Sequence, residues 1–110
     1  MAKKINLNDY LGHSMDCTCG KEHKTNLKIV DIDKDAVSRL PKHIEALGYK
    51  KPFLVADVNT WAAAGALVAE KLDVADISYK KYIFNEKELI PDEKTLGSLM
   101  MAFSRDCDVI

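Results

Sequence analysis

The sequence lacks any apolar run close to the roughly 20 residues that a membrane-spanning helix requires. Residues 1–6 contain no apolar stretch of the signal-peptide type. Neither sign of charge dominates: Lys and Arg total 16, Asp and Glu total 17, and the formal net charge is −1. A balanced charge provides no electrostatic footprint for nucleic acid. We therefore expect a cytoplasmic protein that binds neither a membrane nor a nucleic acid.

Cysteine and glycine are also scarce. The three cysteines are Cys17, Cys19 and Cys107, and they do not form the framework of a disulfide-rich secreted domain. The five glycines are dispersed, and no Gly-rich phosphate loop occurs among them. With 47% hydrophobic and 30% charged residues, the 110-residue chain should fold as one ordinary domain or as part of a larger one.

The stretch from Pro52 to Gly65 has the pattern of half a βαβ unit. Phe53–Ala56 is a continuous apolar run, which predicts a strand buried on both faces. Asp57 ends the run, and Asn59 or Thr60 offers an N-cap for the helix that follows. In open parallel sheets, ligands bind beyond the carboxyl ends of the strands, where a carboxylate can accept hydrogen bonds from a sugar diol. A local Asx-turn or a second cap is the alternative role for Asp57.

Strands and helices are expected to alternate along the rest of the chain. Apolar runs predict strands near 27–32, 77–84 and 107–110, and periodic apolar spacing predicts helices near 40–47, 60–72 and from Pro91 onward. Pro41 should lie in the first turn of its helix and Gly48 should close it. Gly65 should weaken its helix, and we expect a close approach of this helix to the sheet to compensate for that loss. The pattern predicts an α/β fold with a Rossmann-like parallel sheet and flanking helices, truncated before a Gly-rich phosphate loop.

Residues 1–23 differ from the remainder, and we expect them to form an extended arm on an α/β domain of residues 24–110. The arm contains Cys17, Cys19 and His23, which could supply three soft ligands to zinc, with His13 or Asp16 as a fourth. Structural zinc sites usually space their cysteines more widely and draw ligands from two segments. A tight turn with two small packed thiols is the interpretation that the sequence favours, and zinc binding stays open.

Three stretches resemble the N-terminal part of bacterial sn-glycerol-1-phosphate dehydrogenases. They are residues 17–23 (CTCGKEH), residues 52–65, with Leu-Val-Ala-Asp-Val-Asn-Thr and Ala-Gly, and residues 89–110, with Leu-Ile-Pro-Asp-Glu and the closing Asp-Cys-Asp-Val-Ile. These enzymes belong to the superfamily of glycerol dehydrogenase, iron-type alcohol dehydrogenases and dehydroquinate synthase. In that family, the closing strand runs into a Gly-rich pyrophosphate loop.

The resemblance implies a cofactor, a reaction and a partner. By position, Asp57 would hold the adenosine ribose hydroxyls of NAD or NADP, with Asn59 and Thr60 shaping that edge of the pocket. The carboxylate should favour NAD, because it repels a 2′-phosphate. The family interconverts glycerol-1-phosphate and dihydroxyacetone phosphate with a divalent metal (zinc, nickel or iron) held in a helical C-terminal domain. We expect a homodimer.

The resemblance assigns no catalytic residue and no metal ligand to the 110 residues, so we expect them to be inactive alone. Two other functions stay open beside a glycerol dehydrogenase-type polyol oxidoreductase. Asp31, Asp33 and Asp57 resemble the acidic residues of a phosphoacceptor receiver domain. The Cys/His motif could instead mark a small metal-binding or interaction module.

Overall fold

The computed structural model describes residues 6–110, which form two compact units, Met1–Lys34 and Asp35–Ile110. We describe each unit by itself. The first five residues of the predicted arm lie outside the described residues. The predicted boundary between residues 23 and 24 stays a prediction.

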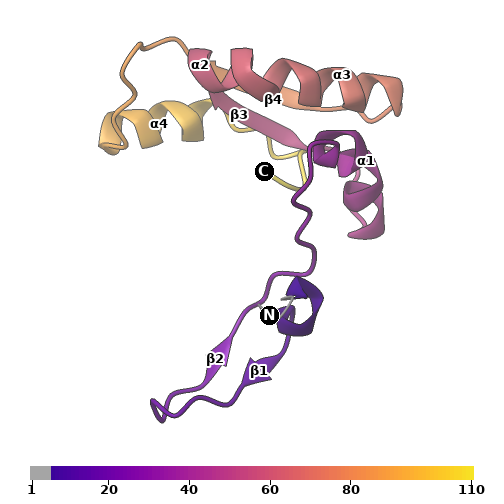
Figure 1. The fold of residues 1–110 in the computed structure, drawn as a ribbon. Coiled ribbons are helices and arrows are strands. Elements are labelled where there is room, and N and C mark those ends of the chain that lie inside the picture. The colour runs from indigo at the N-terminus through magenta and orange to yellow at the C-terminus, as the bar shows by residue number, and fades with distance from the viewer. Residues whose placement is uncertain (1–5) are drawn as a thin grey trace. The chain divides into compact units, whose positions relative to one another are not determined.

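The first unit is built from local structure. A 3₁₀ helix, η1 (Leu7–Tyr10), begins after Asn6, whose side chain accepts a hydrogen bond from the Asn8 N–H. The strands β1 (Ser14–Met15) and β2 (His23–Lys24) pair antiparallel as a short hairpin (Figure 1). The segment that we expected to be extended therefore contains a helical turn and a hairpin.

The predicted strand at residues 27–32 is wrong. This run has no regular structure, and Leu27 and Ile32 are 58% and 81% exposed. An apolar run becomes a strand only where a neighbouring strand satisfies its backbone groups. No strand ladder or bridge among the described residues involves this run, so its apolar pattern alone does not make it a strand.

The second unit contains the predicted parallel sheet. β3 (Phe53–Asp57) pairs in parallel with β4 (Lys80–Phe84), with Phe53 opposite Lys80 and Asp57 opposite Phe84. On its other side, β3 is flanked by a parallel bridge between Pro52 and Val109, where the Phe53 N–H donates to the Val109 carbonyl at 2.7 Å. The α/β fold class is confirmed. Burial of β3 on both faces is not, because Val55 is 36% exposed.

The helix α1 (Ala36–Ala46) starts before the predicted position. Pro41 lies inside it, so the prediction that Pro41 lies in the first turn of a helix starting near residue 40 is wrong. The missing N–H of Pro41 removes one helical hydrogen bond, and burial of its ring offsets part of that cost. Gly48 closes the helix as predicted, with φ +82°, while Gly48 N–H donates to Glu45 and Tyr49 N–H to Ile44 in a Schellman motif.

The helical segment after β3 is continuous but not uniform. α2 (Val58–Thr60) leads into a π-helical turn, η2 (Trp61–Gly65), and then α3 (Ala66–Val74). Its N-cap is Asp57, not Asn59 or Thr60 as predicted. A Cβ placed on Gly65 would lie 2.7 Å from Cε3 of Trp61, so the close neighbour of this glycine is an indole and not the sheet. Residues four apart are neighbours on the surface of a helix, which brings Trp61 and Gly65 together.

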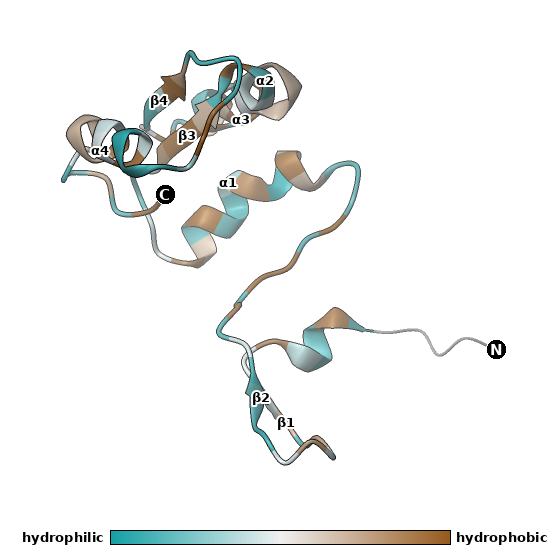
Figure 2. Cartoon of the chain, turned by 90° about the vertical axis from the view of Figure 1, so that its left-hand side faces the viewer, coloured by the Kyte–Doolittle hydropathy of each residue, from teal (hydrophilic) through white to brown (hydrophobic). Residues whose placement is uncertain are grey.

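The last helix, α4 (Glu93–Ala102), has the predicted start, with Asp92 as its N-cap. In both Figure 1 and Figure 2, α4 and the α2–α3 segment lie on opposite sides of the two strands. The predicted apolar face is present, but Leu96 and Met100 are 58% and 68% exposed. The amphipathic spacing correctly predicts the helix, but no other part of the second unit covers Leu96 and Met100.

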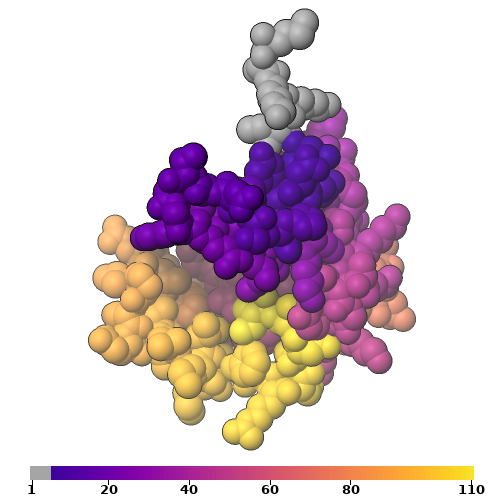
Figure 3. All heavy atoms as spheres, turned by 90° about the horizontal axis from the view of Figure 1, so that it is seen from below, coloured from indigo at the N-terminus to yellow at the C-terminus, as the bar shows by residue number. Residues whose placement is uncertain are grey.

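The core of the second unit is small. Its buried apolar side chains come from α1, β3, α3, β4 and the C-terminal segment: Ile44, Phe53, Ala69, Leu72, Phe84 and Cys107. Phe103, after α4, meets Phe53 edge to face at 5.4 Å between ring centroids. The C-terminal residues of this unit, yellow in Figure 3, lie on the face turned to the viewer. Among the described helices, none is both long enough and apolar enough to cross a bilayer.

Candidate functional site

The candidate site lies at the carboxyl end of β3. Asp57 is the last residue of the strand and also the N-cap of α2, with extended backbone angles (φ −99°, ψ 179°). Asp57 therefore ends a parallel strand and caps the helix that follows, and the capping role given as the alternative to ligand binding is present. The structure brings Asp57 and Thr60 into direct contact through this turn.

Asp57 and Thr60 form a capping box. The Thr60 N–H and hydroxyl donate to Asp57 Oδ1 at 2.7 and 2.9 Å, and the Asp57 N–H donates to Thr60 Oγ1 at 2.9 Å. The two bonds that Thr60 donates to the carboxylate both end on Oδ1. The other oxygen, Oδ2, takes no part in the capping box.

The cap also sets the charge of the site. The hydrogen bond from the Thr60 backbone, followed by that from its hydroxyl, lowers the pKa of Asp57. The carboxylate is therefore ionised at neutral pH and fixed in direction by its own helix. A fixed, charged acceptor at a strand end suits a ligand that offers hydroxyl donors.

The neighbouring residues define the edge of this site. Asn59 and Thr60 are exposed at the first turn of the helix, whereas Asp57 is half-buried. Trp61 directly follows Thr60, and the Lys81 ammonium lies 4.7 Å from the centroid of its ring, which brings a positive charge to the same helix. The three predicted cofactor-contacting residues therefore lie within one turn of backbone.

A second polar cluster lies at the opposite, amino end of β3 and was not foreseen. Asp106 forms ion pairs with Lys51 and with Lys80, the latter at 3.1 Å, and the Lys80 ammonium donates to Ser104 Oγ at 2.6 Å. The hydrogen bonds from Lys51, Ser104 and Lys80 hold the pKa of Asp106 well below its usual range. Asp106 is separated from Lys51 by 55 residues, so no local pattern could have indicated the pair. These contacts hold the C-terminal segment beside β3.

A third cluster lies in the first unit. The ligand atoms of Cys17, Cys19 and His23 all lie within 4.8 Å of one another, and Cys19 Sγ is 3.0 Å from His23 Nε2. All three side chains are exposed, so the predicted tight turn is present but the predicted packing of the thiols is wrong. The hydrogen bond with the Cys19 backbone, and to a smaller extent that with its side chain, lowers the pKa of Cys17.

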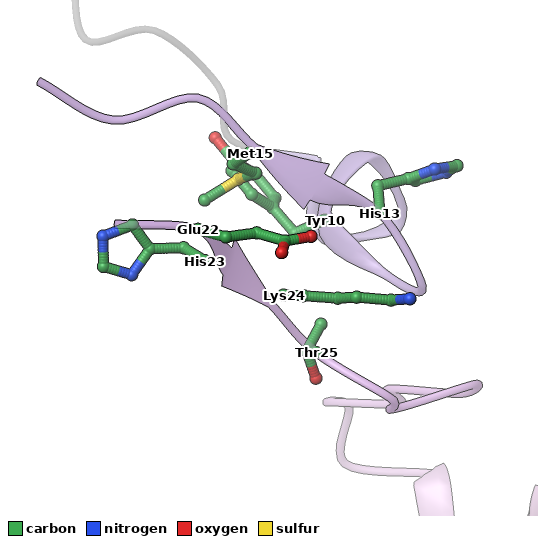
Figure 4. Close-up of a pocket in the computed structure, with 7 residues that line it drawn as sticks. All are labelled: Tyr10, His13, Met15, Glu22, His23, Lys24 and Thr25. Atoms are coloured by element: carbon green, nitrogen blue, oxygen red, sulfur yellow. The ribbon is translucent and has the colours of Figure 1, made fainter. Parts of the chain in front are cut away.

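Neither of the predicted fourth ligands, His13 and Asp16, belongs to this cluster. His23 and His13 line a cavity of about 340 Å³, and Figure 4 shows their rings pointing to opposite ends of it. The cluster therefore offers three protein ligands.

The fold and the site together define an α/β protein of the Rossmann-like type, with an acidic residue at the end of a parallel strand. The chain is similar to glycerol-1-phosphate dehydrogenase (NAD(P)+) of Halalkalibacterium halodurans, with 33% identity over 98 residues, which is 86% of this chain and 25% of that protein. It is also similar to the enzyme of the same name from Bacillus velezensis, with 32% identity over 82 residues, which is 72% of this chain and 21% of that protein.

The resemblance drawn from the sequence motifs is thus confirmed: the chain is a relative of the glycerol-1-phosphate dehydrogenases. It spans about one quarter of the length of the curated relatives that it matches. No family model matches the chain. No solved structure matches it significantly.

Proposed function

We propose that the chain is the cofactor-binding part of an NAD(P)-dependent glycerol-1-phosphate dehydrogenase. The observation that carries this proposal is the 33% identity over 98 residues to a protein whose name states both the substrate and the cofactor. The reaction moves a hydride between the secondary alcohol carbon of glycerol-1-phosphate and the nicotinamide, and releases the hydroxyl proton. When bound, the dinucleotide supplies the hydride acceptor. The resemblance implies that the divalent metal used by the glycerol-1-phosphate dehydrogenases would be held outside these 110 residues.

The strand order supports a nucleotide site at this end of the sheet. β3 lies between β4 and the bridge at Val109, and the chain reaches β4 first and then returns to the other side of β3. The connecting helices lie on opposite sides of the strands (Figures 1 and 2). Such a reversal is the topological switch point at which open α/β sheets bind ligands beyond the carboxyl ends of their strands. Asp57 ends the strand at this switch point.

Each predicted site residue then has a physical role. The Asp57 carboxylate would accept hydrogen bonds from the ribose hydroxyls through Oδ2, since the capping bonds end on Oδ1. Thr60 would act by holding that carboxylate in place, and the exposed Asn59 would shape the adjacent edge. A carboxylate fits a ribose diol and repels a 2′-phosphate, so the site should prefer NAD to NADP.

The test is a titration of the ¹⁵N-labelled chain with NAD, monitored by amide chemical shifts. We expect weak, millimolar binding, because no Gly-rich loop is present to hold the pyrophosphate. Shifts should concentrate at Asp57, Asn59 and Thr60. Asp57→Asn keeps the N-cap, because Asn caps helices as well as Asp, and it should weaken NAD binding by about tenfold.

Asp92→Asn is the matched control. Asp92 caps α4 in the same way, accepting from the Thr95 N–H at 2.9 Å, but does not end a parallel strand. This variant should bind NAD like the parent chain. The proposed cofactor site would be contradicted if millimolar NAD caused no amide chemical-shift change at residues 57–60. It would also be contradicted if Asp57→Asn and Asp92→Asn weakened NAD binding equally.

The receiver-domain alternative loses its main support in the structure. Asp31 and Asp33 would have to follow a strand, and residues 27–32 form none. The two relatives are also named as glycerol-1-phosphate dehydrogenases, which favours that activity over a general polyol oxidoreductase.

We further propose a cytoplasmic homodimer. Leu96, Met100 and Met101 of α4 are exposed apolar residues that a partner chain could cover. Light scattering should give a mass above that of one chain. A monodisperse monomer at micromolar concentration would contradict the dimer.

A further inference from the structure

We propose that Cys17, Cys19 and His23 bind one zinc ion in the loop of the β1–β2 hairpin. The inference concerns the first unit and goes beyond the proposed cofactor role, which involves residues of the second unit.

The ligand atoms are already gathered. All three lie within 4.8 Å of one another, and Cys19 Sγ is 3.0 Å from His23 Nε2. Zinc–sulfur and zinc–nitrogen bonds of about 2.3 and 2.0 Å in a tetrahedron place sulfur and nitrogen about 3.5 Å apart. The existing pair therefore needs to open by only about half an ångström to admit the ion.

The backbone of the loop directs these side chains to one point. Gly20 has φ +77°, a left-handed conformation that glycine adopts without strain, and its N–H donates to the Cys17 carbonyl at 3.2 Å. The turn carries the chain back so that His23, at the start of β2, lies close to the two cysteines. The Cys19 N–H lies 3.4 Å from Cys17 Sγ and donates to it. Such hydrogen bonds to ligand sulfur orient metal-bound thiolates.

The first unit has little else to stabilise it. Among the described residues 6–34, none is buried, and each strand of the hairpin has two residues. A two-stranded hairpin of this size is marginal in water, and small units without a core are commonly stabilised by a metal or a disulfide. A zinc ion would link the beginning of the loop to β2 and supply that missing stabilisation.

The donor set selects the ion. Two thiolates and one imidazole favour a borderline-soft cation such as zinc and disfavour magnesium and calcium, which prefer oxygen. Two thiolates also balance the charge of a divalent ion. Since His13 points away from His23 in Figure 4, the fourth position would be taken by water.

The test is a metal titration of the complete 110-residue chain, stripped of metal and kept reduced. We expect one zinc per chain, and a cobalt-substituted form with thiolate-to-cobalt charge-transfer absorption. Cys17→Ser, Cys19→Ser and His23→Ala should each weaken zinc binding by about tenfold or more. His13→Ala, an exposed histidine of the same unit, is the matched control and should bind zinc like the parent chain.

A second measurement uses only the parent chain and so does not depend on how the variants fold. Zinc should slow alkylation of Cys17 and Cys19 by about tenfold or more, as resolved by peptide mass, because metal-bound sulfur is a poor nucleophile. Zinc should also slow amide exchange across residues 14–24. No zinc uptake at micromolar concentration, unchanged alkylation, or full zinc binding by the Cys17→Ser, Cys19→Ser double variant would overturn the proposal.

Discussion

Asp57 illustrates how one carboxylate can serve structure and binding together. Its Oδ1 accepts both bonds from Thr60, whereas Oδ2 lies outside the capping box. A cap that engages one oxygen fixes the plane of the carboxylate and leaves the other oxygen directed by that plane. The local interpretation and the ligand interpretation of Asp57 are therefore compatible.

Thr60→Val should test the structural half of this arrangement. The substitution keeps the shape of the side chain but removes the hydroxyl that accepts from the Asp57 N–H and donates to its carboxylate. We expect the melting temperature to fall by a few degrees, because a backbone donor is left unpaired at the start of the helix. Asp57→Asn should change it little. Equal melting curves for Thr60→Val and the parent chain would show that the capping box contributes nothing.

At the scale of the element, the two helical glycines provide a matched pair. Gly65→Ala gains about 1 kcal/mol of helix propensity, but its Cβ would lie 2.7 Å from the Trp61 ring. The indole would have to leave its position beneath Lys81, which costs more than the propensity gain. We expect a net loss of about 1 kcal/mol in the free energy of unfolding, measured with urea.

Gly97→Ala is the control for that prediction. Gly97 lies in α4, and a Cβ added there meets nothing within 4 Å. This substitution should raise the free energy of unfolding by about 1 kcal/mol. If Gly65→Ala and Gly97→Ala raised the free energy of unfolding equally, the contact with Trp61 would not explain why glycine is preferred at position 65.

Local patterns predicted some elements and misplaced others. The apolar run before Asp57 and the Asp92 cap are local signals, and β3 and α4 appear where they were predicted. Residues 27–32 carry the same kind of apolar run but form no strand. The difference is a partner: β3 has β4 and Val109 beside it, and sequence pattern alone does not reveal which runs will be paired.

At the scale of the whole molecule, the charged groups predict sensitivity to acid. Hydrogen bonds from backbone or side-chain donors lower the pKa of four carboxylates: Asp57, Asp92, Asp106 and Asp108. A carboxyl group whose pKa is lower in the folded state stabilises the fold above its unfolded pKa, near 3.9, and this stabilisation is lost as the pH falls through the folded value.

The melting temperature should therefore vary little above about pH 5 and fall progressively below about pH 4. Asp108→Asn should flatten the lower part of this profile, because Asp108 accepts from the backbone N–H groups of Lys50 and Lys51 at 2.8 and 2.9 Å. The measurement is a series of thermal melts at constant ionic strength. A melting temperature that rises on acidification would contradict the prediction.

The 110 residues alone should catalyse no oxidation of glycerol-1-phosphate. The resemblance places no catalytic residue or metal ligand of the family within them, and the chain spans about one quarter of its relatives. Absorbance of NADH at saturating substrate, with added zinc, nickel or iron, is the measurement. A chimera in which this chain replaces the matching segment of the H. halodurans enzyme is the positive control. Turnover by the isolated chain would contradict the prediction.

The sequence by itself determined the features that depend on near neighbours in the chain. These include the strand ending at Asp57, the glycine closure of α1 at Gly48 and the helix start at Asp92, because caps, turns and short apolar runs act over a few residues. Tertiary structure decided which apolar run was paired and joined Asp106 to Lys51 across 55 residues. These outcomes depend on contacts between distant segments, which exist only once the chain has folded.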